Sequence, residues 1–414
     1  MFDVTIRLRA RFGLAAIAGA TLLAAPAFAE TSIVVDVATG KVLAANHASA
    51  RWYPASTTKL MTAYVALKAV EEKTAALDTP VVMTRFAASQ PPSKIGFQPG
   101  SVMRLDAALR MLLVKSANDV AVAIGTTLGE GSLEAFVDRM NKEAAALGMK
   151  DTHFVNPNGL PGEGQHSSAK DLAILGARIR SEFPTFTGFF DTEAISVGKA
   201  TIRNTNPLLG RYDGADGMKT GYICASGFNL VGSATRDGRT LVAVVLGASG
   251  PIVRDRIIAD ILEEGFRTDP ATKTVLVSDL PEDSGPPADI SAQICSPQGQ
   301  KERAVERQAE AQRPEHNSGS AYLHEMKRPP VVVPLALGNA AAKGDIEAGA
   351  TLIAAYGIPV PTARPDPSAP PAVPPSIGPD GTPLDAAPPV QAPEGLVEGE
   401  AAGTPAETGD SATN

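Results

Sequence analysis

The sequence predicts an α+β domain in which an antiparallel sheet is flanked by helices. Strand patterns occur near the start of the chain and again around residue 240, and helical patterns fill the interval and follow the second strand pair. This order lacks the regular alternation of strands and helices that builds a parallel sheet, so the sheet is expected to join the two ends of the domain. The chain of 414 residues is 44% hydrophobic, which is enough to bury a sizeable core.

Two pairs of strands form the expected sheet. Residues 32–37 and 41–45 are rich in Val, Ile and Ala, and a Thr-Gly pair between them suits a tight turn. Residues 229–235 and 239–247 flank Arg236-Asp237-Gly238. An Asp-Gly pair between runs rich in β-branched residues is a strong hairpin signal.

The expected helices show apolar residues at intervals of three and four. In the first of them, Leu60, Met61 and Tyr64 begin such a recurrence. The helical segments are residues 57–72, 106–114, 120–128, 133–147, 170–182 and 254–266. Together with the strands they place the main domain in residues 30–267.

The N-terminal end has the pattern of a secretory signal peptide. Three arginines precede an apolar run at residues 12–25, which is followed by Ala27-Phe28-Ala29. This order predicts a signal peptide at residues 1–29 that is cleaved after Ala29. An uncleaved membrane anchor is the alternative, but the run is short for a membrane span. We therefore expect the protein to be exported from the cytoplasm.

Beyond residue 267 the pattern weakens. Residues 268–356 form an extension without a recognisable second domain, with one strand expected at 273–280, a charged helix at 300–312 and a short apolar run at 331–337. Residues 357–414 contain eight acidic residues, one arginine and no aromatic residue, and are dominated by Pro, Ala and Gly. Such a composition offers too little apolar surface to offset the entropy of ordering it, so it predicts a disordered tail.

Composition also excludes several classes of protein. The formal net charge of −8 makes nucleic acid an unexpected partner. Two cysteines exclude a disulfide-rich miniprotein and a Cys-ligated metal module. In an oxidising compartment Cys224 and Cys295 could form a disulfide or remain two thiols, and the sequence leaves both open. The five histidines lack ligand spacing, so neither a metal nor another cofactor is expected.

Three short motifs carry candidate chemistry. Ser56-Thr-Thr-Lys59 begins a predicted helix, where residues three apart share a face, so the hydroxyl of Ser56 can meet the amine of Lys59. A serine hydroxyl needs an adjacent base to act as a nucleophile, and a lysine whose pKa is depressed can be that base. Ser116-Ala-Asn118 lies between two helices and offers a hydroxyl for proton relay and an amide. Lys219-Thr-Gly221, on an expected edge strand, suits an anionic group.

The three motifs in this order are typical of penicillin-binding proteins and class A β-lactamases. Beyond the motifs, the chain resembles the low-molecular-mass D-alanyl-D-alanine carboxypeptidases, serine DD-peptidases of the penicillin-binding protein group. The resemblance spans about residues 31–267 and rests also on residues 153–160 and on Gln165-His-Ser-Ser168 with Asp171. It implies a penicillin-binding protein/β-lactamase-like fold, with a DD-peptidase catalytic domain at residues 30–267.

The resemblance implies a role for each motif residue. Ser56 would attack the carbonyl of the penultimate D-Ala of a peptidoglycan stem peptide and form an acyl-enzyme. Lys59 would be the base, and Ser116 would pass a proton to the departing D-Ala. β-Lactam antibiotics would then act as covalent inhibitors. None of these steps calls for a metal.

Other residues would bind the substrate. The resemblance implies that Asn118 positions the substrate and Lys59, and that Lys219 and Thr220 hold the terminal carboxylate with Arg254 as a second cation. Gly221 would let the substrate backbone approach closely. The backbone N–H groups of Ser56 and Tyr222 would form an oxyanion hole.

Alternative functions use the same residues. A DD-endopeptidase or a transpeptidase differs only in leaving group or acceptor. A class A β-lactamase needs a glutamate acting through water, and residues 153–171 offer only Glu163, without the asparagine that accompanies it. A non-catalytic cell-wall binding protein is disfavoured because the nucleophile, base and carboxylate-binding residues are all present. The membrane-binding amphipathic helix common in this group is not recognisable here, so membrane association is not expected.

Overall fold

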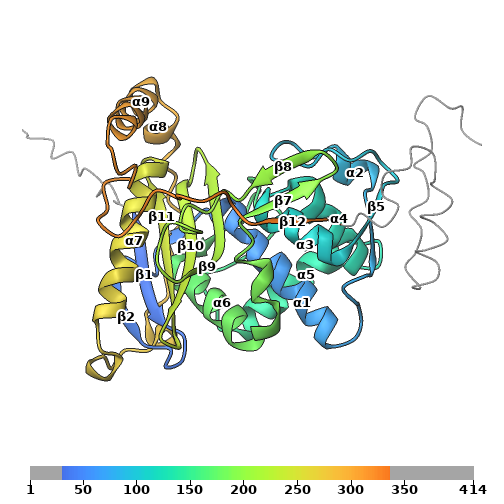
Figure 1. Cartoon of the computed structure of the whole chain (residues 1–414). Helices are drawn as coiled ribbons and strands as arrows, with labels where there is room; N and C mark the ends of the chain where they lie inside the picture. The colour runs from blue at the N-terminus through green and yellow to red at the C-terminus, as the bar shows by residue number, and fades with distance from the viewer. Residues whose placement is uncertain (1–29, 336–414) are drawn as a thin grey trace, which may run out of the picture. The chain divides into compact units, whose positions relative to one another are not determined.

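The computed structural model describes residues 30–335, and in them the predicted α+β fold is confirmed. Its centre is a five-stranded antiparallel sheet with the strand order β2-β1-β11-β10-β9 (Figure 1). The strands are β1 (Thr31–Asp36), β2 (Val42–Asn46), β9 (Ala215–Ile223), β10 (Gly227–Arg236) and β11 (Arg239–Ala248). The sheet thus pairs the first strand of the domain with the last, as the element order predicts.

The two faces of the sheet bury alternate residues of the same strands. On β1, Ile33 and Val35 join a core that includes Leu172 of helix α6 (Ala169–Glu182). Val34 points the other way, into a second core with Ile258 of helix α7 (Pro251–Arg267). Because successive side chains of a strand point to opposite faces, near-continuous apolar strands can be covered by a helix on each side.

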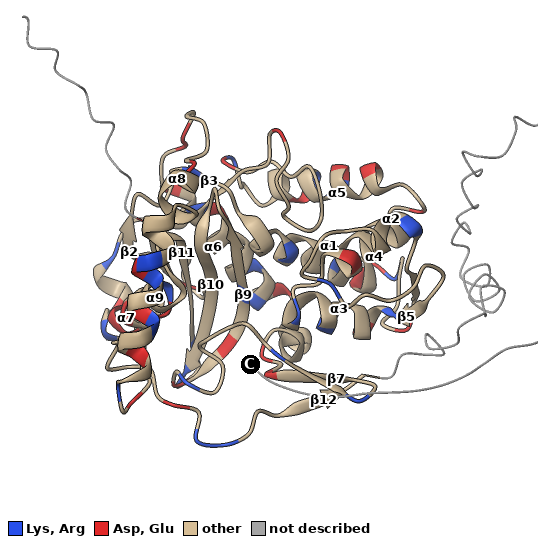
Figure 2. Ribbon diagram, turned by 90° about the horizontal axis from the view of Figure 1, so that it is seen from above, with Lys and Arg blue, Asp and Glu red and all other residues tan. Residues whose placement is uncertain are grey.

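The helices on the α6 side form a subdomain beyond the β9 edge, as the view from above shows (Figure 2). They confirm the predicted segments to within a few residues. They are the 3₁₀ turn η1 (Ala55–Thr58), α1 (Lys59–Glu71), α2 (Arg85–Ala88), α3 (Leu105–Val114), α4 (Asn118–Leu128), α5 (Leu133–Ala146) and the 3₁₀ turn η2 (Pro184–Phe189). The short helix α2 and the turn η2 were not predicted.

Six further strands are too short to leave a sequence pattern. They form three small antiparallel pairs: β3 (Arg51–Trp52) with β6 (Ser167–Ser168), β4 (Pro80–Val82) with β5 (Val102–Arg104), and β7 (Ala194–Val197) with β8 (Ala200–Arg203). Each of these strands has two to four residues, which is at or below the shortest run in which alternation can be recognised.

The described part of the extension, residues 268–335, runs along the surface of the domain and is called the C-terminal segment below. Its elements are η3 (Pro270–Thr272), η4 (Val277–Asp279), α8 (Ser291–Ile294), α9 (Pro297–Ala311) and β12 (Val332–Pro334). Helix α9 confirms the charged helix expected at 300–312. The apolar run at 331–337 contributes β12, which pairs in parallel with β7.

The strand expected at residues 273–280 is wrong. Only an isolated bridge between Lys41 and Leu276 forms there, with main-chain hydrogen bonds from Val42 to Val275 and from Val277 to Gly40. The chain then turns into η4, so the apolar residues follow the edge of β2 for too short a distance to form a strand.

The predicted signal peptide and the predicted tail at 357–414 lie outside the described residues, as do residues 336–356 of the extension. Within residues 30–335, no single helix is long and apolar enough to cross a membrane. Helices α4 and α5 meet that test only as a pair bent by 91°.

Candidate active site

The candidate nucleophile and base lie where η1 joins α1. Ser56 is partly buried on η1, and Lys59, the first residue of α1, is fully buried. The Lys59 Nζ lies 2.9 Å from Ser56 Oγ, 2.7 Å from Asn118 Oδ1 and 2.5 Å from the carbonyl oxygen of Asn158. The structure therefore brings together the residues of the first motif and the asparagine of the second.

The second motif forms the entry to α4. Ser116 has a φ of +61°, a left-handed conformation that is unusual for serine and costs free energy unless its surroundings impose it. Asn118 Nδ2 donates to the carbonyl of Pro91, and Asn118 Oδ1 accepts from Lys59. Among the described residues no hydrogen bond joins the Ser116 hydroxyl to Ser56 or Lys59. Asn118 therefore accepts a hydrogen bond from the candidate base, Lys59, whereas Ser116 lies two residues earlier in a strained backbone conformation.

The environment of Lys59 favours a neutral amine. Burial lowers the pKa of Lys59 well below its usual value, and the positive charge of Lys219 lowers it further. The carboxylate of Asp119 acts in the opposite direction but more weakly. Asp119 is itself buried and accepts hydrogen bonds from the backbone N–H groups of Ile95 and Gly96, which offset part of its charge.

The third motif lies on β9, the edge strand of the sheet, as predicted. Gly221 is required there by close packing, because a Cβ added to it would lie 2.9 Å from the carbonyl oxygen of Pro54 and 3.1 Å from Ser56 N. The absence of a side chain lets β9 approach the backbone of η1, so the third motif is held directly against the serine.

Lys219 and Arg254 form a buried cationic pair behind this strand. Burial lowers the pKa of Lys219 to about 7, and the charge of Arg254 contributes to the same shift. Arg254, on α7, donates to Asp255 Oδ1 at 2.7 Å and 3.0 Å. Lys219 Nζ donates only to the carbonyl of Thr220 among the described residues, so its remaining donors are available to a ligand.

Thr220, within the third motif, and Tyr222, directly after it, have different neighbours. The Thr220 hydroxyl lies 2.7 Å from that of Thr205, on the turn that follows β8. The Tyr222 side chain is 43% exposed, and its ring stacks on Phe228 with centroids 4.4 Å apart. Tyr222 is therefore held on one face and open on the other.

Sequence reasoning assigned no role to the loop that carries Asn158 and Gly159. Its carbonyl at Asn158 accepts from Lys59, and Asn158 Nδ2 donates to Gln90. Gly159 has a φ of +80°, and a Cβ there would lie 1.8 Å from the carbonyl oxygen of Ala55. Their one signal in the sequence is that they belong to residues 153–160, which are part of the family resemblance. A backbone carbonyl that accepts a hydrogen bond requires no particular residue type, so it leaves no pattern.

Comparison with known proteins places the chain in a family. The family model described as D-alanyl-D-alanine carboxypeptidase, of peptidase family S11, matches residues 20–250, which is more than half of the chain. The chain belongs to this family. The match covers every motif residue except Arg254, and the α8–α9 region lies beyond its end.

Relatives in the D-alanyl-D-alanine carboxypeptidase family cover a similar part of the chain. DacF of Bacillus subtilis is 35% identical over 242 residues, which are 58% of this chain and 62% of DacF. DacA of Escherichia coli K12 is 35% identical over 249 residues, which are 58% of this chain and 61% of DacA. The match therefore spans less than two thirds of the length of either relative.

Solved structures of the same group share the fold. The D-alanyl-D-alanine carboxypeptidase DacD from Francisella tularensis has a TM-score of 0.55 and 29% identity, covering 56% of this chain and 69% of that one. Penicillin-Binding Protein D2 from Listeria monocytogenes, in its cefotaxime-bound form, has a TM-score of 0.52 and 30% identity, covering 57% of this chain and 96% of that one. The penicillin-binding protein-like fold expected from the motifs is confirmed.

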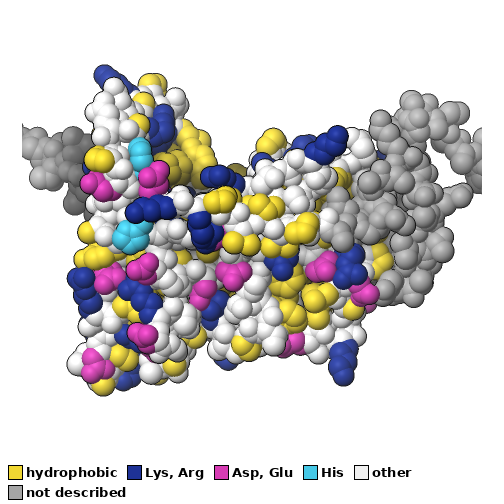
Figure 3. Space-filling view, in the orientation of Figure 1, with side chains coloured by type: hydrophobic (Ala, Val, Ile, Leu, Met, Phe, Trp, Pro, Cys, Tyr) yellow, Lys and Arg dark blue, Asp and Glu magenta, His cyan; other side chains and the backbone are white. Residues whose placement is uncertain are grey.

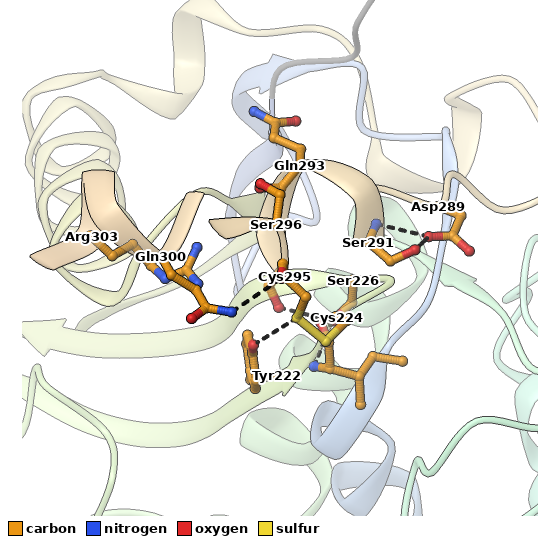
Figure 4. The surroundings of a disulfide bond; sticks show 12 residues. Tyr222, Cys224, Ser226, Asp289, Ser291, Gln293, Cys295, Ser296, Gln300 and Arg303 are labelled. Carbon is orange, nitrogen blue, oxygen red and sulfur yellow. Dashed lines mark hydrogen bonds between the residues drawn. A yellow bond between two sulfur atoms is a disulfide. The ribbon is translucent and has the colours of Figure 1, made fainter. Parts of the chain in front are cut away.

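The two cysteines, which the sequence left open, form a disulfide. Cys224 and Cys295 have Cα atoms 5.6 Å apart and are 71 residues apart in sequence (Figure 4). The bond joins the residue directly after β9, inside the family match, to the residue directly after α8, outside it. Within residues 30–335, no group of three or more His, Cys, Asp or Glu side chains is arranged to hold a metal ion.

Proposed function

We propose that the protein is a serine DD-carboxypeptidase that removes the terminal D-Ala from peptidoglycan stem pentapeptides through an acyl-enzyme on Ser56. Membership of the family supports the reaction class. The finer assignment of roles is supported by the contacts of the three motifs.

The observation that carries the proposal is the coordination of Lys59. A neutral amine has two N–H donors and one lone pair, and Asn118 Oδ1 and the Asn158 carbonyl are two acceptors that can use both donors. The lone pair is then left for the hydroxyl proton of Ser56, 2.9 Å away. Since burial and Lys219 both favour the neutral form, Lys59 is suited to be the general base.

The remaining residues take the roles that the family resemblance implies. Lys219, Thr220 and Arg254 bind the terminal carboxylate, which fits the free donors of the Lys219 ammonium. The backbone N–H groups of Ser56 and Tyr222 stabilise the oxyanion, a contribution of about 3 kcal/mol for each such donor in other enzymes. Ser116 relays a proton to the leaving D-Ala, and Asn118 holds both Lys59 and the substrate.

The proposal includes a location and an inhibitor class. A signal peptide at residues 1–29 would deliver the protein to the periplasm, where its peptidoglycan substrate lies. β-Lactams would acylate Ser56, in keeping with the relative from Listeria monocytogenes whose structure is described as the cefotaxime-bound form.

The test is D-alanine release from a pentapeptide that ends in D-Ala-D-Ala. We expect release by the full mature chain, and a loss of at least about a thousandfold in Ser56→Ala because the nucleophile is removed. A covalent adduct with a β-lactam, measured by intact mass, should form on the wild type and not on the variant. Thr57→Ser, at the neighbouring buried position, is the matched control and should keep the adduct.

Either of two results would contradict the proposal. D-alanine release by Ser56→Ala would exclude Ser56 as the nucleophile. A β-lactam adduct without D-alanine release would favour the endopeptidase, which shares the acylation residues, and cleavage of cross-linked muropeptides would then identify it.

A further inference from the structure

Helices α8 and α9, which lie beyond the family match, are joined by the disulfide to the chain directly after the third motif. Residues 291–311, comprising α8, α9 and the link between them, are called the arm. In the space-filling view the arm is a ridge beside a hollow that separates it from the helical half of the molecule (Figure 3). The arm lies beyond residue 250, where the match to the family model ends.

The arm is attached to the site strand covalently and by polar contacts. Cys295 forms the disulfide with Cys224, which lies two residues after Tyr222 and directly after the end of β9. Ile290, the residue directly before the arm, donates from its backbone N–H to the carbonyl of Ala225 in the β9–β10 turn. At the other end, Arg303 donates to the carbonyl of Ser249. The arm is thus fixed at both ends of its contact with the sheet.

The arm also contacts the exposed tyrosine of the site, through Cys295. The Tyr222 hydroxyl lies 3.5 Å from Cys295 Sγ (Figure 4). The Tyr222 ring packs on Phe228. The Arg303 guanidinium lies over the Phe228 ring, 5.7 Å from its centroid. Tyr222, Phe228 and Arg303 therefore form a continuous stack that leads from the site to the arm.

Two features of this stack suit a ligand. Within the described residues Arg303 forms no salt bridge with a carboxylate, so its guanidinium keeps donors free. Tyr222 leaves one ring face exposed directly after the motif that would hold the terminal carboxylate. Aromatic faces and free N–H donors together suit the planes and carbonyls of a peptide chain.

We propose that the arm, held by the Cys224–Cys295 disulfide, is an added wall of the site, and that the Tyr222–Phe228–Arg303 stack binds the part of the substrate peptide upstream of the scissile bond. The nature of the ligand rests on the proposed function. The wall contacts no reacting atom, so Arg303 and the disulfide act as specificity and positioning elements and not as catalytic residues.

The experiment measures how much more tightly the protein binds a longer peptide than a shorter one. Ser56→Ala protein, which cannot turn over substrate, is titrated with a pentapeptide and with an N-acetylated dipeptide, both ending in D-Ala-D-Ala. We expect the pentapeptide to bind more tightly, and its advantage to fall about fivefold when Arg303→Ala is added, the size of one lost cation–π or aromatic contact. Adding Cys224→Ala with Cys295→Ala should reduce the advantage at least as much.

Matched controls separate this effect from loss of structure. Arg307→Ala, at an exposed position on the same helix, should keep the full advantage of the pentapeptide. Trp52, the chain's single tryptophan, is buried and donates to the Ser226 carbonyl in the β9–β10 turn, so unchanged emission would show that this turn is intact. Arg303→Ala keeps the disulfide and tests the wall even where the cysteine variant does not fold.

The proposal would be wrong if the affinity advantage of the pentapeptide over the dipeptide were unchanged in Arg303→Ala, or if it were reduced equally in Arg307→Ala. It would also be wrong if the pentapeptide had no advantage. Failure of the proposed function would give a different result. The wild type would then release no D-alanine, while the variants would still bind the two peptides in the expected pattern, and the role of the arm in binding would stand.

Discussion

The family domain and the C-terminal segment differ in which side chains they bury. The domain buries Lys59 and Lys219, and burial lowers the pKa of both amines from their usual values. The segment buries only three large apolar side chains, Val277, Ile294 and Leu323, and is otherwise held by backbone hydrogen bonds, ion pairs and the disulfide. We infer that substitutions in the first region change rate constants and those in the second change affinity and stability.

The largest effect is expected at the buried base. Lys59→Met removes the amine that would accept the Ser56 proton while keeping much of the side-chain volume, so acylation by a β-lactam should slow by at least about a thousandfold. Stopped-flow measurement of the acylation rate tests this expectation.

The control for this variant lies on the same helix. Lys68→Met removes a partly exposed lysine of α1 whose ammonium pairs with Glu143, far from the motif residues. It should be acylated at the wild-type rate. Acylation of Lys59→Met at that same rate would refute the role of Lys59 and, with it, the division between the two regions.

A smaller, pH-dependent effect is expected at Lys219. With a pKa of about 7, its ammonium is charged below that pH and is lost above it, so binding of the substrate carboxylate should weaken as the pH rises. The KM should increase by up to about tenfold per pH unit above the pKa, while kcat should not fall because a neutral Lys59 is favoured. Measurement of KM and kcat from about pH 6 to about pH 9 tests both signs.

Lys219→Arg sharpens the test. Arginine stays charged throughout this range, so the rise of KM with pH should disappear even if the absolute KM is worse. A wild-type KM that does not change with pH, or a rise that persists in Lys219→Arg, would show that another group titrates.

The sequence predicts the domain better than it predicts the segment, for the same physical reason. Strands β10 and β11 have ten residues each and an Asp-Gly turn, so pattern alone locates them within two residues. In the segment, β12 has only three residues and pairs with β7, which lies far away in the chain. Long periodic elements carry their own signal, whereas short ones are defined by contacts that the sequence does not record.

The candidate site divides in the same way. Ser56 and Lys59 are three residues apart on one helical turn, so their contact follows from local geometry. The Asn158 carbonyl and the Cys224–Cys295 bond depend on the tertiary fold. A backbone acceptor has no residue type to recognise, and two cysteines 71 residues apart specify no distance.

The smallest of these effects, on stability alone, is expected where the segment crosses the domain. Lys170 Nζ lies 2.6 Å from Asp151 Oδ2, both side chains are buried, and the same ammonium donates to the Pro281 carbonyl of the segment. Lys170→Met leaves the buried carboxylate of Asp151 with only the more distant cation of Arg51, whose Nε lies 3.9 Å away, so the free energy of unfolding should fall by about 3 kcal/mol. Urea denaturation monitored by circular dichroism measures this change.

The neighbouring Lys150 supplies the matched comparison. Its ammonium lies 2.7 Å from Glu282 Oε1, so it too joins the domain to the segment, but both side chains are largely exposed. Water and salt screen such a pair, so Lys150→Met should leave the urea midpoint unchanged within measurement. Equal losses of unfolding free energy in the two variants would mean that exposed and buried ion pairs stabilise the segment alike. A loss confined to Lys170→Met would mean that the buried ion pair stabilises this contact and the exposed pair does not.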